Sequence, residues 1–414
     1  MKLPFRRGRK SPTPELGEQD ASEPGRGVPP RGRPIRDLCS HSAHSEAVPP
    51  AEPLARSWIR QFRPDVREWE KIMKAVVFLG EGKLELREFP DPVPGPDEVV
   101  IRMKASGMCG SDLHHLHEPR RREDQIVIEG HEPCGVVELV GSAVRPAEAR
   151  VGDRVMVHHY DGCRTCSHCR SGWTQLCETD RVVYGGLNGH GAHAEFMKVP
   201  AHTLIRLHDD MTFKAGAAVA CGSGTAYAAL KRIDLSGDDT VAVFGQGPVG
   251  LSVTMFAKAM GARVIALDVG AERLAMARRF GADIVINPLE VEPVQAIRDV
   301  TRGGSGADKA VECSANVEAR RQAIRCTRTW GTTVMIGVTG NVEFHSNDII
   351  LQNRSVLGSL TFSKNLQSDC SDFVMERGLP VDELFTHEFR LEQAEEAYGL
   401  FDQKKIGKGV FVFD

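Results

Sequence analysis

A glycine-rich segment between two apolar runs restricts the fold more than any other part of the chain. The short run Val241-Ala242-Val243-Phe244 leads directly into Gly245-Gln246-Gly247-Pro248-Val249-Gly250. A helical pattern then continues from Val249 to Met260, and a second apolar run from Val264 to Leu267 ends at Asp268. A strand, a GxGxxG turn, a helix, a second strand and an acid in this order predict the βαβ unit of a dinucleotide-binding sheet.

The three glycines of this segment stand where a side chain would obstruct binding or packing. Gly245 permits the tight turn, Gly247 lets the backbone approach a pyrophosphate, and Gly250 lets the helix pack closely on the strand. The helix that opens at Pro248 and Val249 presents free backbone N–H groups and the positive end of its dipole to this anion. The segment therefore predicts the phosphate-binding part of the site.

Asp268, at the end of the second strand, indicates which dinucleotide is bound. It follows Gly245 by 23 residues, where its carboxylate can accept hydrogen bonds from both ribose hydroxyls of the adenosine. The same charge would repel a 2′-phosphate, so NAD is favoured over NADP. Arg273, one helical turn further on, is either a neighbour of this ribose or a solvated helix residue, and the sequence leaves both interpretations open.

The pattern of predicted strands and helices divides the rest of the chain into two kinds of structure. Strand, helix and strand recur after the glycine motif through residues 310–311 and 333–336, as in a doubly wound parallel sheet. From Met73 to about Val199, short strand-like runs alternate with Gly, Pro and Asp, and these runs are Glu98–Met103, Val136–Val140 and Arg154–Val157. A helix is expected at 392–401 and a final strand at 409–413. The predicted class is α/β, with a mostly-β domain beside a parallel sheet.

The first 72 residues have a different composition from the remainder. They hold 11 of the 23 prolines and several arginine-rich stretches, which predicts a disordered extension. This segment has no apolar stretch of the kind found in a secretory signal, and its acidic residues argue against a transit peptide. One hypothesis is that the working protein starts at Met73. Peptides from residues before Met73, found by mass spectrometry of the native N-terminus, would contradict it.

Composition excludes several classes of partner. The chain of 414 residues carries a formal charge of −4 and 26% charged residues, so it has no dominating basic field that would attract nucleic acid or an anionic membrane surface. No run of about 18 apolar residues indicates a transmembrane helix. The chain has eleven cysteines, many of which must stay reduced, and no targeting signal can be recognised in it. The cytoplasm is therefore the expected compartment.

Four closely spaced cysteines predict a structural zinc site. Their pattern is CxxCxxCx7C, with Gly162 and Gly172 placed for sharp turns, and the residues are Cys163, Cys166, Cys169 and Cys177. Four thiolates close a tetrahedron around Zn²⁺ and leave no position open. A zinc ribbon for nucleic acid is the alternative, but Arg164 and Arg170 alone supply positive charge within the loop.

A second set of zinc-binding residue types is dispersed along the chain. It consists of Cys109, His131 and Cys221, which spacing alone does not join. Two thiolates and one imidazole would leave the fourth zinc position free for a substrate oxygen. Such a metal acts as a Lewis acid, lowering the pKa of an alcohol so that hydride can leave toward a nicotinamide.

The segment Gly130-His131-Glu132-Pro133-Cys134-Gly135, followed by Gly141 and Val144, resembles the signature of the zinc-containing alcohol dehydrogenases of the medium-chain dehydrogenase/reductase superfamily. The similarity runs from Met73 to Asp414. It implies a GroES-like catalytic domain interrupted by a Rossmann domain. The expected divisions are an N-terminal extension (1–72), the catalytic domain with its zinc lobe (73–221), the NAD-binding domain (222–359) and a return to the catalytic domain (360–414).

The resemblance also implies roles for individual residues around the metal. Cys109, His131 and Cys221 match the catalytic zinc ligands, so the chain is expected to hold two zinc ions, one catalytic and one structural. Asp112 matches the carboxylate that orients the imidazole of His131. Glu132 matches the acid close behind the metal.

Three further residues match positions in the proton relay and the nicotinamide site. Ser111 is similar to the hydroxyl residue that takes the alcohol proton, which then passes through the nicotinamide ribose to His114 and into solvent. Thr225 resembles the residue that contacts the nicotinamide. The family also implies a homodimer or a homotetramer.

The expected activity is oxidation of a small primary or secondary alcohol by NAD to an aldehyde or ketone, or the reverse reaction. A polyol or sugar dehydrogenase is the alternative, although the cysteine at the third ligand position differs from the glutamate of many sorbitol-type enzymes. Polar segments at 114–117, 158–161 and 184–190 are the candidate walls of the substrate pocket. A nucleotide-binding regulator without turnover is a third reading, but no expected ligand or relay group is missing.

Overall fold

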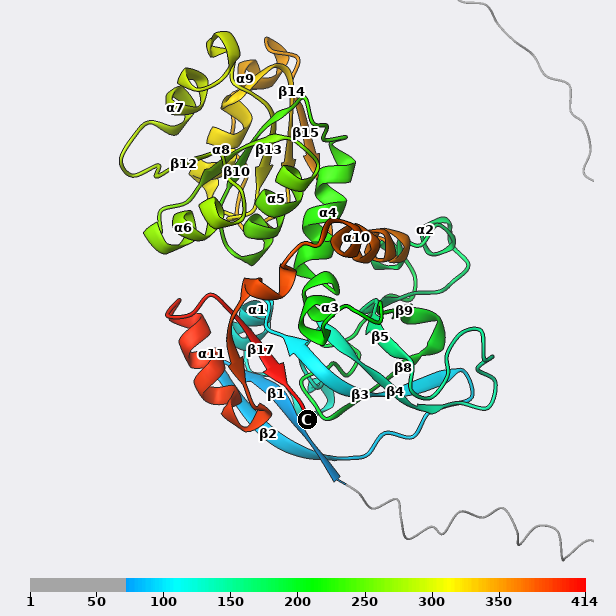
Figure 1. The fold of residues 1–414 in the computed structure, drawn as a ribbon. Coiled ribbons are helices and arrows are strands. Elements are labelled where there is room, and N and C mark those ends of the chain that lie inside the picture. Colours follow the sequence, from blue (N-terminus) through cyan, green and yellow to red (C-terminus); the bar gives the residue numbers. More distant parts are fainter. Residues whose placement is uncertain (1–71) are drawn as a thin grey trace, which may run out of the picture. The chain divides into compact units, whose positions relative to one another are not determined.

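Two large β-sheets organise residues 72–414, the part of the chain that the computed structural model describes (Figure 1). The expected extension and the hypothesis of a start at Met73 concern residues outside this part, except for Ile72, which is the first residue of strand β1 (Ile72–Gly80). Strand β1 pairs with β2 (Lys83–Pro90) in an antiparallel hairpin. Gly80 and Gly82, with φ of +81° and +75°, provide the left-handed turn between them.

The first large sheet has seven strands and combines the beginning and the end of the chain. Its order is β16-β17-β3-β4-β5-β9, with β8 paired on β3. The strands are β3 (Glu98–Gly107), β4 (Pro133–Val140), β5 (Arg154–Val157), β8 (Phe196–Pro200), β9 (Leu204–Arg206), β16 (Phe385–Phe389) and β17 (Lys408–Val412). All pairs are antiparallel except β16 with β17. The C-terminal strands therefore rejoin the sheet that the N-terminal strands begin.

The second large sheet is parallel throughout and has the order β12-β11-β10-β13-β14-β15. Its strands are β10 (Thr240–Phe244), β11 (Arg263–Leu267), β12 (Ile284–Ile286), β13 (Ala307–Glu312), β14 (Thr327–Met335) and β15 (Ser355–Gly358). The connecting helices are α5 (Pro248–Ala259), α6 (Ala271–Arg279), α7 (Pro293–Asp299), α8 (Val317–Arg325) and α9 (Ser346–Ile350). The order corresponds to 3-2-1-4-5-6, the doubly wound arrangement of dinucleotide-binding folds. The predicted α/β class is confirmed.

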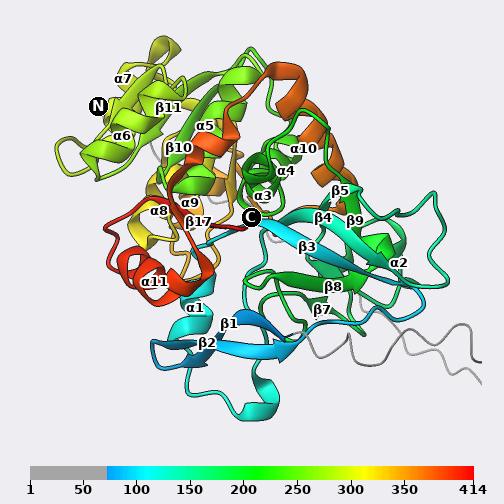
Figure 2. The same ribbon diagram turned by 60° about the horizontal axis from the view of Figure 1, so that its bottom comes forward.

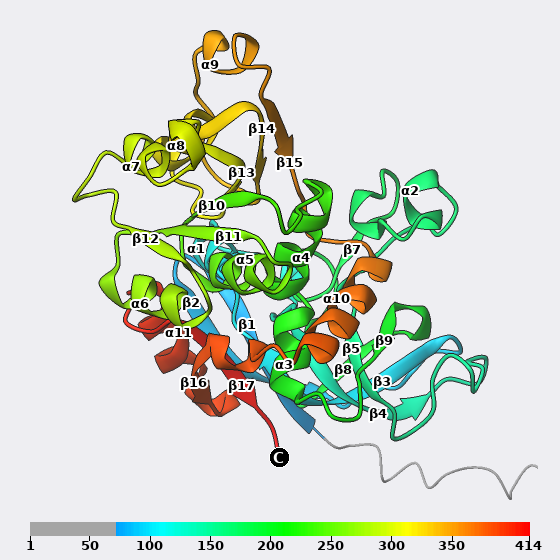
Figure 3. The ribbon, with the colours of Figure 1, turned by 45° about the horizontal axis from the view of Figure 1, so that its top comes forward.

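Three helices link the two sheets: α3 (Phe213–Val219), α4 (Gly222–Arg232) and α10 (Lys364–Arg377). Figure 3 shows α10 beside α3 and α4. One apolar core runs from Met156 on β5 through Val219 and Leu230 to Val243 on β10. Cys221 lies between α3 and α4 and has non-helical backbone angles (φ −144°, ψ −80°). It separates the two helices and caps the start of α4, at the border of the two sheets.

The C-terminal helix α11 (Ala394–Asp402) packs near the short helix α1 (Asp112–His117) and the β1–β2 hairpin (Figure 2). A separate apolar cluster holds them together and includes Phe78, Leu116, Tyr398 and Phe411. This packing brings the last part of the chain behind the segment that carries Cys109. None of the helices within 72–414 is both long and apolar enough to cross a membrane.

Candidate active site and metal centres

The three dispersed zinc-binding residues meet at one point. Cys109 follows β3, His131 lies two residues before β4, and Cys221 stands at the start of α4. Their two Sγ atoms and one imidazole nitrogen all lie within 4.8 Å of one another. In a tetrahedral zinc site the ligand atoms are about 3.5–3.8 Å apart, given Zn–S and Zn–N bonds of about 2.3 and 2.0 Å. The donor types and their spacing therefore fit a zinc ion with one coordination position open.

Ser111 borders this cluster. Its hydroxyl oxygen lies 3.2 Å from Sγ of Cys109 and 3.2 Å from Nε2 of His131. A small molecule whose oxygen completed the metal site would therefore meet a hydroxyl group. His114, three residues further along, is exposed on α1 and no hydrogen bond of its ring is found within residues 72–414.

The buried Asp112 fixes the state of the His131 imidazole. Its Oδ1 lies 3.0 Å from Nδ1 of His131, and its Oδ2 accepts the backbone N–H of Cys109 at 2.8 Å. Burial alone would raise the pKa of Asp112, but the adjacent His131 lowers it, so the carboxylate accepts rather than donates. Nδ1 of His131 must then carry the proton, which leaves Nε2 free to bind a metal.

Glu132, the residue after His131, is paired with a lysine that the sequence did not single out. Its carboxylate oxygens are 2.7 and 2.6 Å from Nζ of Lys408, which also donates to the backbone carbonyl of Met108 at 2.9 Å. A Cβ at Gly107 would approach Oε2 of Glu132 to 2.0 Å, so only glycine leaves room for the acid. Burial raises the pKa of Glu132, and the ion pair with Lys408 opposes that change.

Aromatic and polar side chains form a wall beside the three ligands. The His159 ring lies 5.1 Å from that of His131 and 4.3 Å from that of Tyr160. Phe362 packs edge-on against His159 at 6.2 Å. The hydroxyl oxygen of Thr361, the residue before Phe362, is buried and lies close to Tyr160. The predicted polar segment 158–161 thus adjoins the cluster.

In the other two predicted wall segments, three imidazoles have partners of their own. His115 lies 3.4 Å from the buried Glu129, and His117 lies 3.0 Å from Asp402. In the segment 184–190, His190 accepts the backbone N–H of Ile128 at 3.0 Å. These imidazoles therefore brace the loops of the first sheet.

The glycine motif has the expected local geometry. Gly245 has φ of +87°, which favours glycine, and a Cβ at Gly250 would lie 1.8 Å from the carbonyl oxygen of Gly245. A Cβ at Gly247 would meet nothing within 4 Å, so open space lies at the N-terminus of α5, where Pro248 and Val249 begin the helix. This is the free helix end that an anion can approach.

A cavity of about 440 Å³ extends from this motif along the ends of β10 and β11. Asp268 lines it, held by the backbone N–H groups of Gln246 at 2.7 Å and Gly270 at 2.8 Å. Arg273 also lines it, 3.8 Å from the Asp268 carboxylate. Lys404, which the sequence did not single out, reaches the same cavity from the loop after α11. Thr225 is buried on α4, one turn after Cys221.

The four-cysteine lobe forms a second cluster in which all four sulfurs lie within 4.8 Å of one another. Backbone N–H groups point at the sulfurs, for example from Cys163 to Cys177 and from Cys166 to Cys163, each at 3.3 Å. Hydrogen bonds from Thr165, Thr179 and the Cys166 backbone lower the pKa of Cys163 to about 5. A Cβ at Gly162 would lie 2.7 Å from Cys169 Sγ. This arrangement can hold zinc with no open position.

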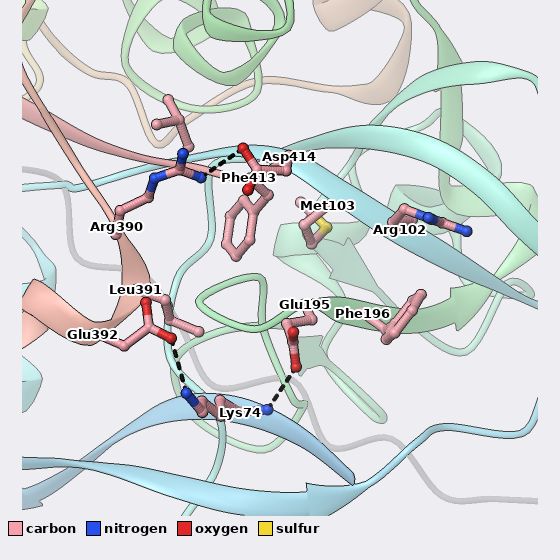
Figure 4. A pocket seen from close by; sticks show the side chains of 11 residues that line it. Lys74, Arg102, Met103, Glu195, Phe196, Arg390, Leu391, Glu392, Phe413 and Asp414 are labelled. Atoms are coloured by element: carbon pink, nitrogen blue, oxygen red, sulfur yellow. Dashed lines mark hydrogen bonds and ion pairs between the residues drawn. The ribbon is translucent and has the colours of Figure 1, made fainter. Parts of the chain in front are cut away.

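A further cavity, shown in Figure 4, contains none of the predicted site residues. Its charged groups are already paired: Nζ of Lys74 lies 3.0 Å from Glu392, and Arg390 donates to Asp414 at 2.8 Å. Glu195 accepts the backbone N–H of Lys74 at 2.9 Å. With these charges satisfied within the chain, the cavity offers no evident ligand site.

Comparison with known proteins identifies the family. A model of the alcohol dehydrogenase GroES-like domain matches residues 95–209, and a model of the zinc-binding dehydrogenase domain matches residues 248–377. The uncharacterized zinc-type alcohol dehydrogenase-like protein YphC of Escherichia coli (strain K12) is 39% identical, over 83% of this chain and 99% of that protein. The chain therefore belongs to the zinc-containing alcohol dehydrogenases of the medium-chain dehydrogenase/reductase superfamily.

Other similar proteins act on different alcohols. The erythritol/L-threitol dehydrogenase of Mycolicibacterium smegmatis is 33% identical, over 79% of this chain and 94% of the relative. The structure of the alcohol dehydrogenase TADH from Thermus sp. ATN1 superposes with a TM-score of 0.75 at 30% identity, over 82% of this chain and 99% of that chain. These relatives support the family, and the substrates that their names give are those of the relatives.

Proposed function

We propose that this protein is a zinc-dependent alcohol dehydrogenase that transfers hydride between a small primary or secondary alcohol and NAD, giving an aldehyde or a ketone. The observation that supports this most is the meeting of Cys109, His131 and Cys221 within 4.8 Å, with the Ser111 hydroxyl at their border. Zinc held there would lower the pKa of an alcohol bound at the open position.

In this proposal the chain's own side chains hold the metal and the cofactor, orient the ligand imidazole and move the alcohol proton. Ser111 would take the alcohol proton as its own hydroxyl proton moves on, and His114, exposed on α1, would release a proton to solvent. Asp112 holds the His131 imidazole, while Glu132 and Lys408 supply a neutral pair behind it. Gly245, Gly247, Pro248, Val249 and Gly250 would hold the cofactor phosphates, Thr225 would contact the nicotinamide, and Asp268 and Arg273 would hold the adenosine ribose.

The four-cysteine lobe would hold a second zinc ion, which makes two per chain. Both clusters need reduced thiols, and the ten cysteines within 72–414 are all free. A reducing compartment such as the cytoplasm suits this requirement.

A homodimer or homotetramer through the parallel-sheet domain remains our expectation for the assembly. Strand β15 is the edge of that sheet, and large apolar side chains near this edge are exposed, namely Trp330, Val338, Ile350 and Leu351. Large exposed apolar side chains in this part of the chain favour association.

A polyol substrate is the second candidate, and one observation favours it. The wall beside the ligands carries His159, Tyr160 and the buried hydroxyl of Thr361, polar groups that could bind a second substrate hydroxyl. The similar erythritol/L-threitol dehydrogenase gives this candidate a precedent. An assay of reduced-cofactor absorbance distinguishes the two candidate substrates. It is run with short primary and secondary alcohols, tetritols, hexitols and aldoses, each with NAD and with NADP. Turnover of simple alcohols supports the first candidate, turnover of polyols alone supports the second, and reduction of NADP alone contradicts the proposed cofactor.

Removal of the Asp268 carboxylate should relax the choice of cofactor. In Asp268→Ala, two charge-assisted hydrogen bonds to the ribose are lost, so kcat/KM for NAD should fall on the order of 100-fold, while NADP is repelled less. Steady-state kinetics with both cofactors measure the ratio. Glu318→Ala is the matched control, because this acid lines the same cavity but is paired with Arg321 at 3.1 Å. An unchanged ratio in Asp268→Ala would remove this residue from the ribose site.

Loss of the proposed terminal relay group should slow alcohol oxidation most in acid. His114→Ala should reduce the rate about tenfold at about pH 6 and much less at about pH 9, because release of a proton to water is hardest in acid. The rate of NADH formation across this range provides the measurement. His117→Ala, on the same helix and paired with Asp402, should give the parent profile. If both variants follow the parent, His114 has no part in the relay.

A further inference from the structure

A line of buried polar side chains continues behind Asp112, away from the metal ligands. The Tyr398 hydroxyl donates to Oδ2 of Asp112 at 2.8 Å. Nε2 of His193 lies 2.7 Å from the Tyr398 oxygen, and Nδ1 of His193 lies 2.7 Å from the Ser106 hydroxyl. Asp112, Ser106 and His193 are fully buried, and Tyr398 is 1% exposed. Each of these four residues makes at least one hydrogen bond, which makes the burial of their polar groups tolerable.

The direction of every hydrogen bond in this line follows from the carboxylate at its end. Asp112 can only accept, so Tyr398 donates its proton and its oxygen must accept one from Nε2 of His193. Nδ1 of His193 is then unprotonated and accepts the Ser106 hydroxyl. This requires a neutral imidazole, and burial lowers the pKa of His193 to about 4. One tautomer of His193 therefore satisfies the whole line.

His193 also supports the backbone that carries the metal ligand. Gly130, directly before His131, has φ of +93°, and a Cβ there would lie 2.4 Å from Nδ1 of His193. The backbone N–H of His193 donates to the carbonyl of Glu129, at 2.8 Å. The imidazole thus fills the space beside the turn that delivers His131 to the cluster.

We propose that Ser106, His193 and Tyr398 form a positioning relay that holds Asp112 and, through it, the His131 imidazole in the orientation that binds metal. The relay rests on the proposed function in one respect, namely that His131 is a ligand. Tyr398 is the member that contacts Asp112 directly. It stands on α11, 286 positions from Asp112 in the sequence. Through that hydroxyl the C-terminal segment helps to set the geometry of the metal site.

The test compares Tyr398→Phe with the parent as full-length proteins. The variant removes one hydroxyl, keeps the ring that packs on Phe78 at 4.9 Å, and leaves Asp112 Oδ2 with the Cys109 N–H alone. Loss of an outer-shell partner typically weakens metal binding 10–100-fold. Competition with a chelator should therefore show zinc leaving the three-residue site at least about tenfold more readily, with the four-cysteine site unchanged. The cobalt-substituted protein should show a shifted visible spectrum.

Two further variants separate positioning from general stability. Tyr227→Phe, a mostly buried tyrosine on α4 outside this line, should keep the parent's zinc affinity and spectrum. His193→Phe removes both of its hydrogen bonds while retaining a ring, and its effect on zinc affinity should not add to that of Tyr398→Phe, since both act through one line. Additive effects would contradict the relay.

The outcomes distinguish the relay from the function on which it rests. A parent that holds zinc at both sites and a Tyr398→Phe variant with unchanged zinc affinity would overturn the relay alone. A lower melting temperature with unchanged zinc affinity and spectrum would also overturn it, because that is the result of a structural role. A parent with no zinc at the three-residue site would overturn the proposed function and the relay together.

Discussion

The Cys109→Ala variant should lose turnover and one zinc ion per chain, while it still binds NAD. Two ligands, His131 and Cys221, would remain at a site that needs three, so the metal should be lost. Lewis-acid assistance is worth several kcal/mol, so kcat/KM should fall on the order of 1,000-fold or more. NAD binding should persist because the glycine motif and Asp268 belong to the other sheet. Metal analysis, steady-state kinetics and NADH titration measure the three quantities.

A matched control is available in Cys326→Ala. Cys326 is a fully buried thiol in the parallel-sheet domain and belongs to neither cluster. Its removal should cost stability of about 1 kcal/mol and leave both zinc ions and turnover in place. Undiminished activity in Cys109→Ala would refute the assignment of the catalytic site, whatever the control shows.

The Cys177→Ala variant should lose the other zinc ion and much of its thermal stability. Between Cys163 and Cys177 the lobe has only the four-residue helix α2 (Ser167–Arg170) and one 3-10 turn, so little besides the metal can order it. Loss of a structural zinc removes folding free energy directly, and a decrease of several kcal/mol would lower the melting temperature by on the order of 10 °C.

Calorimetry with and without a chelator measures this effect. Cys370→Ala, a buried thiol on α10 outside the lobe, should keep both zinc ions and respond to the chelator as the parent does. Addition of chelator should lower the melting temperature of the parent. Cys177→Ala should already have the lower melting temperature, and the chelator should change it little. A Cys177→Ala protein with the parent's melting temperature and zinc content would show that the lobe does not depend on metal.

Much of the fold was predictable because its signals are local. The runs at 98–103, 154–157 and 264–267 are strands, and the segment after Gly245 is the helix α5. Apolar periodicity and glycine placement encode such elements within a few residues. The 14-residue helix α10 and the short strand β15 were not predicted, because both depend on burial against α4 and β14 and carry weak periodicity of their own.

The site was predictable only in part, for the same reason. The four clustered cysteines are legible from spacing, whereas Cys109, His131 and Cys221 were joined by their chemistry and by family resemblance. Lys408, Tyr398 and His193 were missed because each looks like an ordinary strand, helix or loop residue, and their partners lie 276, 286 and 87 positions away. Only the folded chain shows that Lys408 pairs with the buried Glu132, and that Tyr398 and His193 form a line of hydrogen bonds ending at the buried Asp112.

We propose that two zinc sites, one with an open position and one without, support NAD-linked turnover of an alcohol. Zinc content measured on the same purified sample that is assayed for NADH formation tests it most directly. We predict two zinc ions per chain, with turnover lost when a chelator removes the ion held by Cys109, His131 and Cys221. Turnover that persists in a sample free of zinc, or a parent that binds neither zinc at the three-residue site nor NAD, would contradict the claim.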